Sequence, residues 1–218
     1  MLPIEVMQKA QAEFLDYNNM GASVIEISHR CKEFGEIIDR CDALLRELAD
    51  IPSNYKILYV HGGAQMQFSA VPLNLINRNP ARKASFVLTG TWAVKASKEA
   101  DRYGTALNIA SSEDSNFNHI PEFNASMLDP ESSYVHIVSN NTLYGTRWQS
   151  FPDTGDIPLV TDMTSEFMSR KIDVSQFGVI FAGLQKNLGP AGLAVVIIRE
   201  DLLEHAIPET PGLLNYKT

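Results

Sequence analysis

Apolar runs and stretches with helical spacing alternate along the chain. Apolar residues spaced three and four apart predict an amphipathic helix from about Glu33 to Ala49, and Pro3 begins an earlier helix that reaches about Asp16. Short apolar runs typical of strands follow at Lys56–Val60, Ser85–Thr89, Tyr134–Val138, Pro158–Thr161, Gly178–Phe181 and Leu193–Arg199. Helical patterns separate several of these runs, at Met66–Ile76, Thr91–Arg102 and Asp201–Ala206.

The predicted strands are continuously apolar instead of alternating between apolar and polar residues. Such strands are covered on both faces, which predicts an α/β fold: a mostly parallel sheet with helices on both faces. The segment Ser111–Glu131 is rich in Ser, Asn, Asp and Pro and is interpreted as an excursion within the domain. We therefore expect one domain over residues 1–218.

Composition and charge narrow the class of partner. The chain has 218 residues, of which 44% are hydrophobic, so it can bury a sizeable core, and its net charge of −8 with no basic run argues against nucleic-acid or acidic membrane partners. Cys31 and Cys41 have no zinc-like spacing, and we predict no metal site. The first residues do not resemble a signal peptide and no apolar run has the length of a membrane span, so we expect a cytoplasmic protein that binds a small molecule.

Polar residues follow directly after several predicted strands. In open parallel sheets, ligands bind outside the carboxyl ends of the strands, so these residues are the candidates for a site. They are His61–Gln65, Gly90–Trp92, Ser139–Thr142, Asp162 and Gln185–Lys186.

Each candidate has two interpretations. The turn HGGAQ at His61–Gln65 offers backbone N–H groups and a helix N-terminus to a phosphate, or it is a tight turn that needs glycine; Walker A and GxGxxG patterns are absent. Trp92 covers a planar ligand or belongs to the core, and Asp162 pairs with a backbone N–H or with a cation. Lys186 is a partly desolvated amine that can attack a carbonyl, or a turn lysine with its head in water. Taken together, the set matches the phosphate, flat ring, pyridinium nitrogen and aldehyde of pyridoxal 5'-phosphate.

Long segments also carry a resemblance to a known family. They are VIEISHRCKEF, NYKILYVHGGAQMQFSAVPLNLI, GTWAVKASKEA, SNNTLYGT and IDVSQFGVIFAGLQKNLGPAGLAVVIIREDLL. Through them the chain resembles the phosphoserine aminotransferases, class V members of the fold-type I enzymes that use pyridoxal 5'-phosphate. The resemblance implies that the chain is the large, cofactor-binding domain of such an enzyme.

The resemblance implies a role for each candidate residue. Lys186 would be the Schiff-base lysine and Asp162 the partner of the pyridinium nitrogen, which makes these two the catalytic pair. The further cofactor contacts would be stacking by Trp92, a hydrogen bond from Thr142 near the phenolic oxygen, and phosphate binding by the backbone of Ala64 and Gln65 with the Gln185 side chain, assisted by Thr164 or Ser165. His29 and Arg30 would bind the phosphate of the substrate.

The implied reaction is reversible amino transfer in serine biosynthesis. O-phospho-L-serine and 2-oxoglutarate would exchange with 3-phosphooxypyruvate and L-glutamate, and 4-phosphohydroxy-L-threonine of vitamin B6 synthesis is a further implied substrate. Lys186 would move the proton that leaves the substrate Cα. The family implies a homodimer.

The sequence departs from the family pattern in three places. A GP-containing segment before Leu2-Pro3 is absent, Ala64-Gln65 and Leu184 replace more usual residues, and the chain stops before an NTPPT-type motif and a C-terminal small domain. We therefore expect a fragment or split product that pairs with a separate C-terminal fragment and has little or no activity alone. The alternatives are another class V activity, such as alanine–glyoxylate transamination or cysteine desulfuration, or a non-catalytic cofactor-binding chain; His29 and Arg30 favour a phosphorylated substrate.

Overall fold

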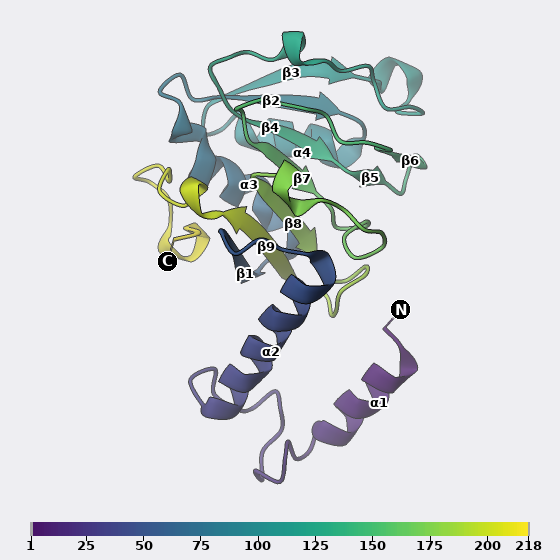
Figure 1. Cartoon of the computed structure of the whole chain (residues 1–218), viewed down its shortest axis with the longest axis vertical. Coiled ribbons are helices and arrows are strands. Elements are labelled where there is room, and N and C mark those ends of the chain that lie inside the picture. Colours follow the sequence, from purple (N-terminus) through teal and green to yellow (C-terminus); the bar gives the residue numbers. More distant parts are fainter. Residues whose placement is uncertain (1, 218) are drawn as a thin grey trace.

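A seven-stranded sheet forms the centre of the molecule, in the order β1-β9-β8-β7-β4-β2-β3 (Figure 1). The computed structural model describes residues 2–217. The strands of this sheet are β1 (Tyr55–His61), β2 (Lys83–Leu88), β3 (Thr105–Ser111), β4 (Ser132–Val138), β7 (Leu159–Asp162), β8 (Val179–Gly183) and β9 (Leu193–Arg199), and the hairpin strands β5 (Asn140–Asn141) and β6 (Thr146–Arg147) pair separately.

The sheet is mostly parallel, as predicted. The pairs β2–β3, β2–β4, β4–β7 and β7–β8 are parallel, and β9 alone runs against both of its neighbours, β1 and β8. The other strands consequently end at the same edge of the sheet. The loops that follow them meet there, and this places the candidate site.

Helices cover the two faces of the sheet unequally. Helices α3 (Gly63–Leu75) and α4 (Thr91–Ala100) pack on one face against a core that includes Phe86, Phe181 and Val196. The other face is covered by the end of α2 (Lys32–Ala49) and by loop residues such as Trp148 and Phe167. Apolar burial on both faces explains why these strands carry no alternating pattern.

Helix α1 (Ile4–Glu13) and the N-terminal part of α2 lie apart from this body (Figure 1). Figure 1 shows α2 extending away from the sheet and α1 joined to its far end by a loop. None of the residues of α1 is buried. No helix within residues 2–217 is long and apolar enough to cross a membrane.

Two expectations about the elements were wrong. Strand β3 was not predicted, because its sequence TALNIAS mixes polar and apolar residues at the edge of the sheet, where one side of the backbone has no partner strand. The predicted helix at Asp201–Ala206 is only a short 3₁₀ turn, Glu200–Leu202, in which Leu202 is the buried residue.

Candidate active site

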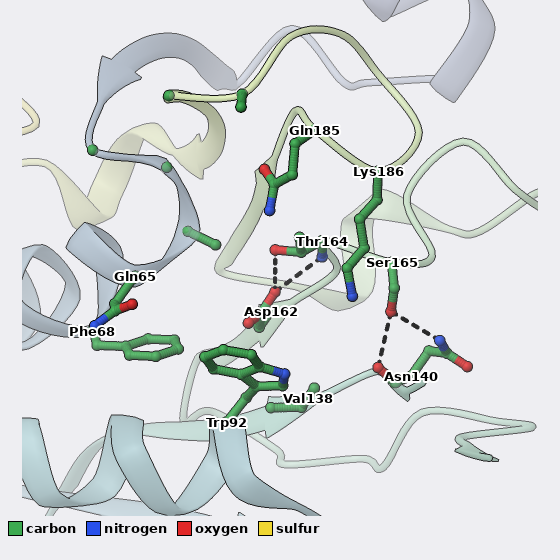
Figure 2. A pocket seen from close by; sticks show the side chains of 15 residues that line it. Gln65, Phe68, Trp92, Val138, Asn140, Asp162, Thr164, Ser165, Gln185 and Lys186 are labelled. Carbon is green, nitrogen blue, oxygen red and sulfur yellow. Dashed lines mark hydrogen bonds between the residues drawn. The ribbon is translucent and has the colours of Figure 1, made fainter. Parts of the chain in front are cut away.

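A cavity of about 350 Å³ lies at the edge of the sheet where the parallel strands end (Figure 2). Loops that follow β1, β2, β4, β7 and β8 all contribute to it. Its lining residues are Gly62, Gly63, Ala64, Gln65, Phe68, Trp92, Val138, Asn140, Asp162, Thr164, Ser165, Gln185, Lys186, Ala191 and Gly192. The cavity therefore lies where ligands bind in parallel sheets, at the carboxyl ends of the strands.

Asp162 ends β7 and forms the inner wall of the cavity. Its side chain is buried, and its Oδ1 accepts bonds from Thr164 N at 2.9 Å and from Thr164 Oγ1 at 2.6 Å. Burial raises the pKa of this carboxyl above its usual range, against the lowering effect of the two Thr164 bonds and of the Lys186 charge. No group within residues 2–217 donates to Oδ2. The carboxylate therefore suits a cationic N–H donor inside the cavity.

Lys186 reaches the cavity from the loop after β8. Its side chain points toward Asp162 in Figure 2, and Nζ donates to Thr142 Oγ1 at 3.3 Å. The interpretation of a partly desolvated amine was wrong, because Lys186 is an exposed residue at the rim. The apolar strands on either side of its loop do not shield it, since the loop carries the lysine beyond them into solvent.

The N-terminus of α3 provides a cradle of backbone donors. Gly62, with φ of 82°, precedes the helix and no side chain caps it, so the first N–H groups face the cavity without an intrahelical partner. Gly62 and Gly63 both have positive φ, a conformation that favours glycine. The same turn also presents backbone N–H groups that could bind an anion. The backbone N of Ala64 and the side chain of Gln185 meet over Gly183.

A methyl group at Gly183 should fill this cradle. A Cβ there would lie 2.6 Å from Gln185 Oε1 and 3.2 Å from Ala64 N. We expect Gly183→Ala to weaken the binding of inorganic phosphate at least about fivefold, because it removes close approach to the backbone donors. Calorimetric titration measures this. Gly189→Ala is the matched control, since its Cβ would make only ordinary contacts with Leu184 at 3.7 Å; equal affinities for both variants and the parent chain would contradict the cradle.

Trp92 stands in the first turn of α4 and forms a second wall. It is half-buried, its ring centroid lies 6.4 Å from that of Phe68, and Lys95 Nζ lies 4.7 Å above the ring. Figure 2 shows its indole beside Asp162, with one part of the ring turned to the cavity. Trp92 therefore packs partly in the core and still offers an aromatic surface to a flat ligand.

The β5–β6 hairpin brings Thr142 to the lysine. Thr142 is exposed, and among residues 2–217 its hydroxyl meets the site through Lys186. The hairpin is fixed beneath it by Asn140 Nδ2, which donates to Ser165 Oγ at 2.8 Å, and by the buried Asn141, which donates to Thr89 Oγ1 at 3.1 Å. Thr142 reaches Lys186 only because the chain forms this hairpin, and the pattern of apolar runs did not predict the hairpin.

Two groups of predicted residues lie elsewhere or act differently. The Thr164 hydroxyl donates to Asp162 and accepts from Gly183 N at 3.1 Å, and Ser165 Oγ accepts from Asn140 Nδ2, so both hydroxyls bond to neighbouring protein groups while the two residues line the cavity. His29 and Arg30 are exposed in the loop before α2 and do not line the cavity. Sequence reasoning missed Gly183, and it named Thr164 only as an aid to phosphate binding and not as the donor to Asp162, because short turns leave no periodic signal.

Comparison with known proteins agrees with this geometry. The family described as Aminotransferase class-V matches residues 1–214. The chain belongs to the class V aminotransferase family. A curated relative, phosphoserine aminotransferase of Lysinibacillus sphaericus (strain C3-41), is 48% identical over 217 residues, which is 100% of this chain and 59% of the relative.

Solved structures of class V aminotransferases share the same fold. Phosphoserine aminotransferase from Bacillus circulans subsp. alkalophilus superimposes with a TM-score of 0.93 at 42% identity, covering 100% of this chain and 60% of that one. The PLP-bound phosphoserine aminotransferase from Trichomonas vaginalis gives 0.91 at 36% identity, covering 100% and 61%. The chain thus spans about 60% of the length of these relatives.

Proposed function

We propose that the chain is the cofactor-binding part of a pyridoxal 5'-phosphate-dependent phosphoserine aminotransferase. One observation carries the proposal: an amine, a buried carboxylate, an aromatic ring and an uncapped helix N-terminus surround the same cavity. The names of the relatives support the reaction, because several that are 46–49% identical over the whole chain are phosphoserine aminotransferases. A single domain over residues 1–218 is part of the proposal.

The donor set fits the parts of pyridoxal 5'-phosphate. The phosphate would lie at the N-terminus of α3, held by the backbone of Ala64 and Gln65 and by the Gln185 side chain, where Gly183 leaves room for it. Asp162 Oδ2 would accept the ring N–H, and Trp92 would cover one face of the ring. Thr142 would bond near the phenolic oxygen. A buried carboxylate, an anion cradle and a free amine in one cavity suit this cofactor better than a nucleotide.

The chain's own residues then do the following work. When bound, pyridoxal 5'-phosphate supplies an aldehyde for amines and a cationic ring that accepts electrons. Asp162 holds the proton of the ring nitrogen by its charge, and Thr164 keeps its oxygens oriented. Lys186 Nζ, held beside Thr142, takes the proton from the substrate Cα and later returns it as general base and acid.

Phosphorylated amino acids and 2-oxo acids, with glutamate, are the proposed substrates. His29 and Arg30 would recognise the substrate phosphate, and neither has an ion-pair partner within residues 2–217. Because both lie outside the cavity, they would act when the remaining length of the relatives, or a second copy, completes the site. We propose a homodimer for the full-length protein, or pairing with a separate C-terminal fragment, with 4-phosphohydroxy-L-threonine as a further substrate.

Reductive trapping tests the cofactor site directly. We expect the chain incubated with pyridoxal 5'-phosphate and reduced with borohydride to carry a pyridoxyl group on Lys186, because Lys186 lines the cavity that would hold the aldehyde. Peptide mapping by mass spectrometry measures the modified positions, and exposed Lys98 of α4 serves as the internal reference. Labelling of Lys98 and Lys186 to equal extents would contradict the proposal, as would a chain that takes up no cofactor.

A further inference from the structure

Lys186 lies in a tight turn that by itself does not fix its amine. In this lysine turn, Leu184 to Gly189, the backbone N–H groups of Leu188 and Gly189 both donate to Leu184 O, at 3.0 and 2.8 Å. Lys186 is exposed at the middle of the turn, and its long side chain has many rotamers in water. Some other contact has to decide where the lysine turn sits against the cavity.

Asn187 makes that contact. Its Nδ2 donates to Ser165 O at 3.3 Å and to Phe167 O at 3.2 Å, so both amide hydrogens bond to backbone carbonyls of one segment. These bonds bridge 22 and 20 residues of sequence, from the loop after β8 to the loop after β7. Asn187 is otherwise an exposed residue, and the sequence gives no sign that its side chain is engaged.

The segment that receives these bonds is fixed in the core. In this anchor segment, Met163 to Phe167, Met163 N donates to Phe181 O at 2.9 Å, and Phe167 N donates back to Met163 O at 2.8 Å. Phe167 is 2% exposed. The lysine turn is therefore attached to a segment that is itself bonded to β8 and packed into the core.

The anchor segment also positions the groups that Lys186 faces. Thr164 within it bonds to Asp162, and Ser165 bonds to Asn140 at the start of the hairpin that carries Thr142. Its buried Glu166 pairs with Arg170 at 2.7 Å, whose Nη2 donates to the carbonyl of Trp148 just after the hairpin. One segment thus sets the carboxylate, the hydroxyl and, through Asn187, the lysine.

From these contacts we infer that Asn187 is a positioning residue for Lys186. It holds the lysine turn on the anchor segment, so that Nζ stays beside Thr142 and facing Asp162. The inference rests on the proposed function, in which Lys186 Nζ is the amine that reacts with the cofactor aldehyde. An amine kept in place before the aldehyde arrives reacts faster than one that samples solvent.

Three substitutions separate this role from a simple preference for turns. Asn and Asp both favour turns and have the same shape, but only Asn can donate two N–H bonds. If Asn187 serves only the turn, Asn187→Asp should resemble the parent chain. If it positions the lysine, Asn187→Asp should resemble Asn187→Ala, and Asn187→Gln, which keeps the two donors, should retain part of the effect. Asn118→Ala, in an exposed loop on another part of the chain, is the matched control.

Two measurements read the result. The first is the rate at which borohydride traps pyridoxal 5'-phosphate on Lys186 relative to Lys98. We expect this rate to fall about tenfold in Asn187→Ala and Asn187→Asp, because both variants lose the two hydrogen bonds of the Asn187 amide. The second is hydrogen exchange of the Leu188 and Gly189 amides without cofactor, which should accelerate at least about fivefold in the same variants. Asn187→Ala adds no charge near the amine or these amides, so its exchange rates report the attachment of the turn without an electrostatic contribution.

The outcomes also distinguish the two proposals. Failure of the parent chain to label Lys186 would refute the proposed function, while the exchange rates would still test the attachment of the turn. A parent chain that labels Lys186, with variants that label it at the same rate, would overturn the role of Asn187 whether or not exchange changes. Slower labelling together with faster exchange in Asn187→Ala and Asn187→Asp is the expected result.

Discussion

Replacement of Asp162 by asparagine is expected to weaken binding of pyridoxal 5'-phosphate by about a hundredfold or more. Removing one partner of a buried charge pair costs roughly 3–5 kcal/mol, and about 1.4 kcal/mol corresponds to a tenfold change in affinity. Asn keeps an oxygen for the two Thr164 bonds but turns an N–H toward the cavity, where the ring nitrogen would also present an N–H. The loss should appear in an absorbance titration of the cofactor.

The same substitution should leave the cofactor-free chain as stable as before, or more stable. Burial raises the pKa of Asp162, so its charge is unfavourable in the folded state at neutral pH. The parent chain should gain stability as the pH falls through this raised pKa, because the folded state then binds the proton more tightly, and Asp162→Asn should remove that gain. A lower unfolding temperature with unchanged affinity would refute a functional role. Asp156→Asn, at an exposed position, is the matched control.

The residues at the ends of the apolar strands were predictable from sequence. Asp162, Trp92 and Lys186 each follow a different apolar run, and a parallel sheet necessarily gathers the ends of its strands at one edge. Their types then suggested a phosphate, a flat ring and an aldehyde. Only the fold class was required to predict that these residues meet, and the continuously apolar strands indicate that class.

The partners of these residues were not predictable in the same way. Thr164 bonds to Asp162 two residues away and also accepts from Gly183 N, 19 residues away, and Asn187 bonds only to backbone atoms 20 and 22 residues away. The longer bonds depend on how two turns meet. The exposure of Lys186 depends on how far its loop extends beyond the strands, which the apolar runs do not encode. Likewise, His29 and Arg30 were assigned by resemblance alone, and the folded chain holds them outside the cavity.

His136 should make the chain unusually sensitive to mild acid. It lies in β4, 2% exposed, with its ring centroid 5.2 Å from that of Phe86 and 6.1 Å from that of Phe181. Among residues 2–217 neither ring nitrogen has a hydrogen-bond partner, and burial lowers the pKa of His136 from 6.5 to about 3. The ring therefore stays neutral in the folded protein, and only the unfolded chain takes up its proton at pH 4 to 6.

The sign of this effect is fixed by the lowered pKa. Below pH 6.5 the unfolded state binds the proton and the folded state does not, so the free energy of unfolding should fall by about 1.4 kcal/mol per pH unit, or roughly 2 kcal/mol between pH 6.5 and pH 5. That is a large share of the roughly 5–15 kcal/mol that stabilises a domain. Asp162, whose pKa is raised, has the opposite effect on the pH dependence of stability. Because Asp162 is present in the parent chain and in the His136 variant, its contribution cancels when the two are compared.

His136→Leu isolates the effect of this one ring. Leucine fills a similar space without unpaired polar atoms, so at pH 7.5 the variant should be as stable as the parent chain or more stable. Between pH 6.5 and pH 5 its urea unfolding midpoint should fall less steeply, whereas exposed His119→Gln should follow the parent curve. Parallel curves for the parent and His136→Leu would mean that the buried ring takes up a proton without unfolding. The expected divergence would instead show that His136 sets how far the pH can fall before the sheet that carries Asp162 unfolds. His136 is not among the residues that line the cavity.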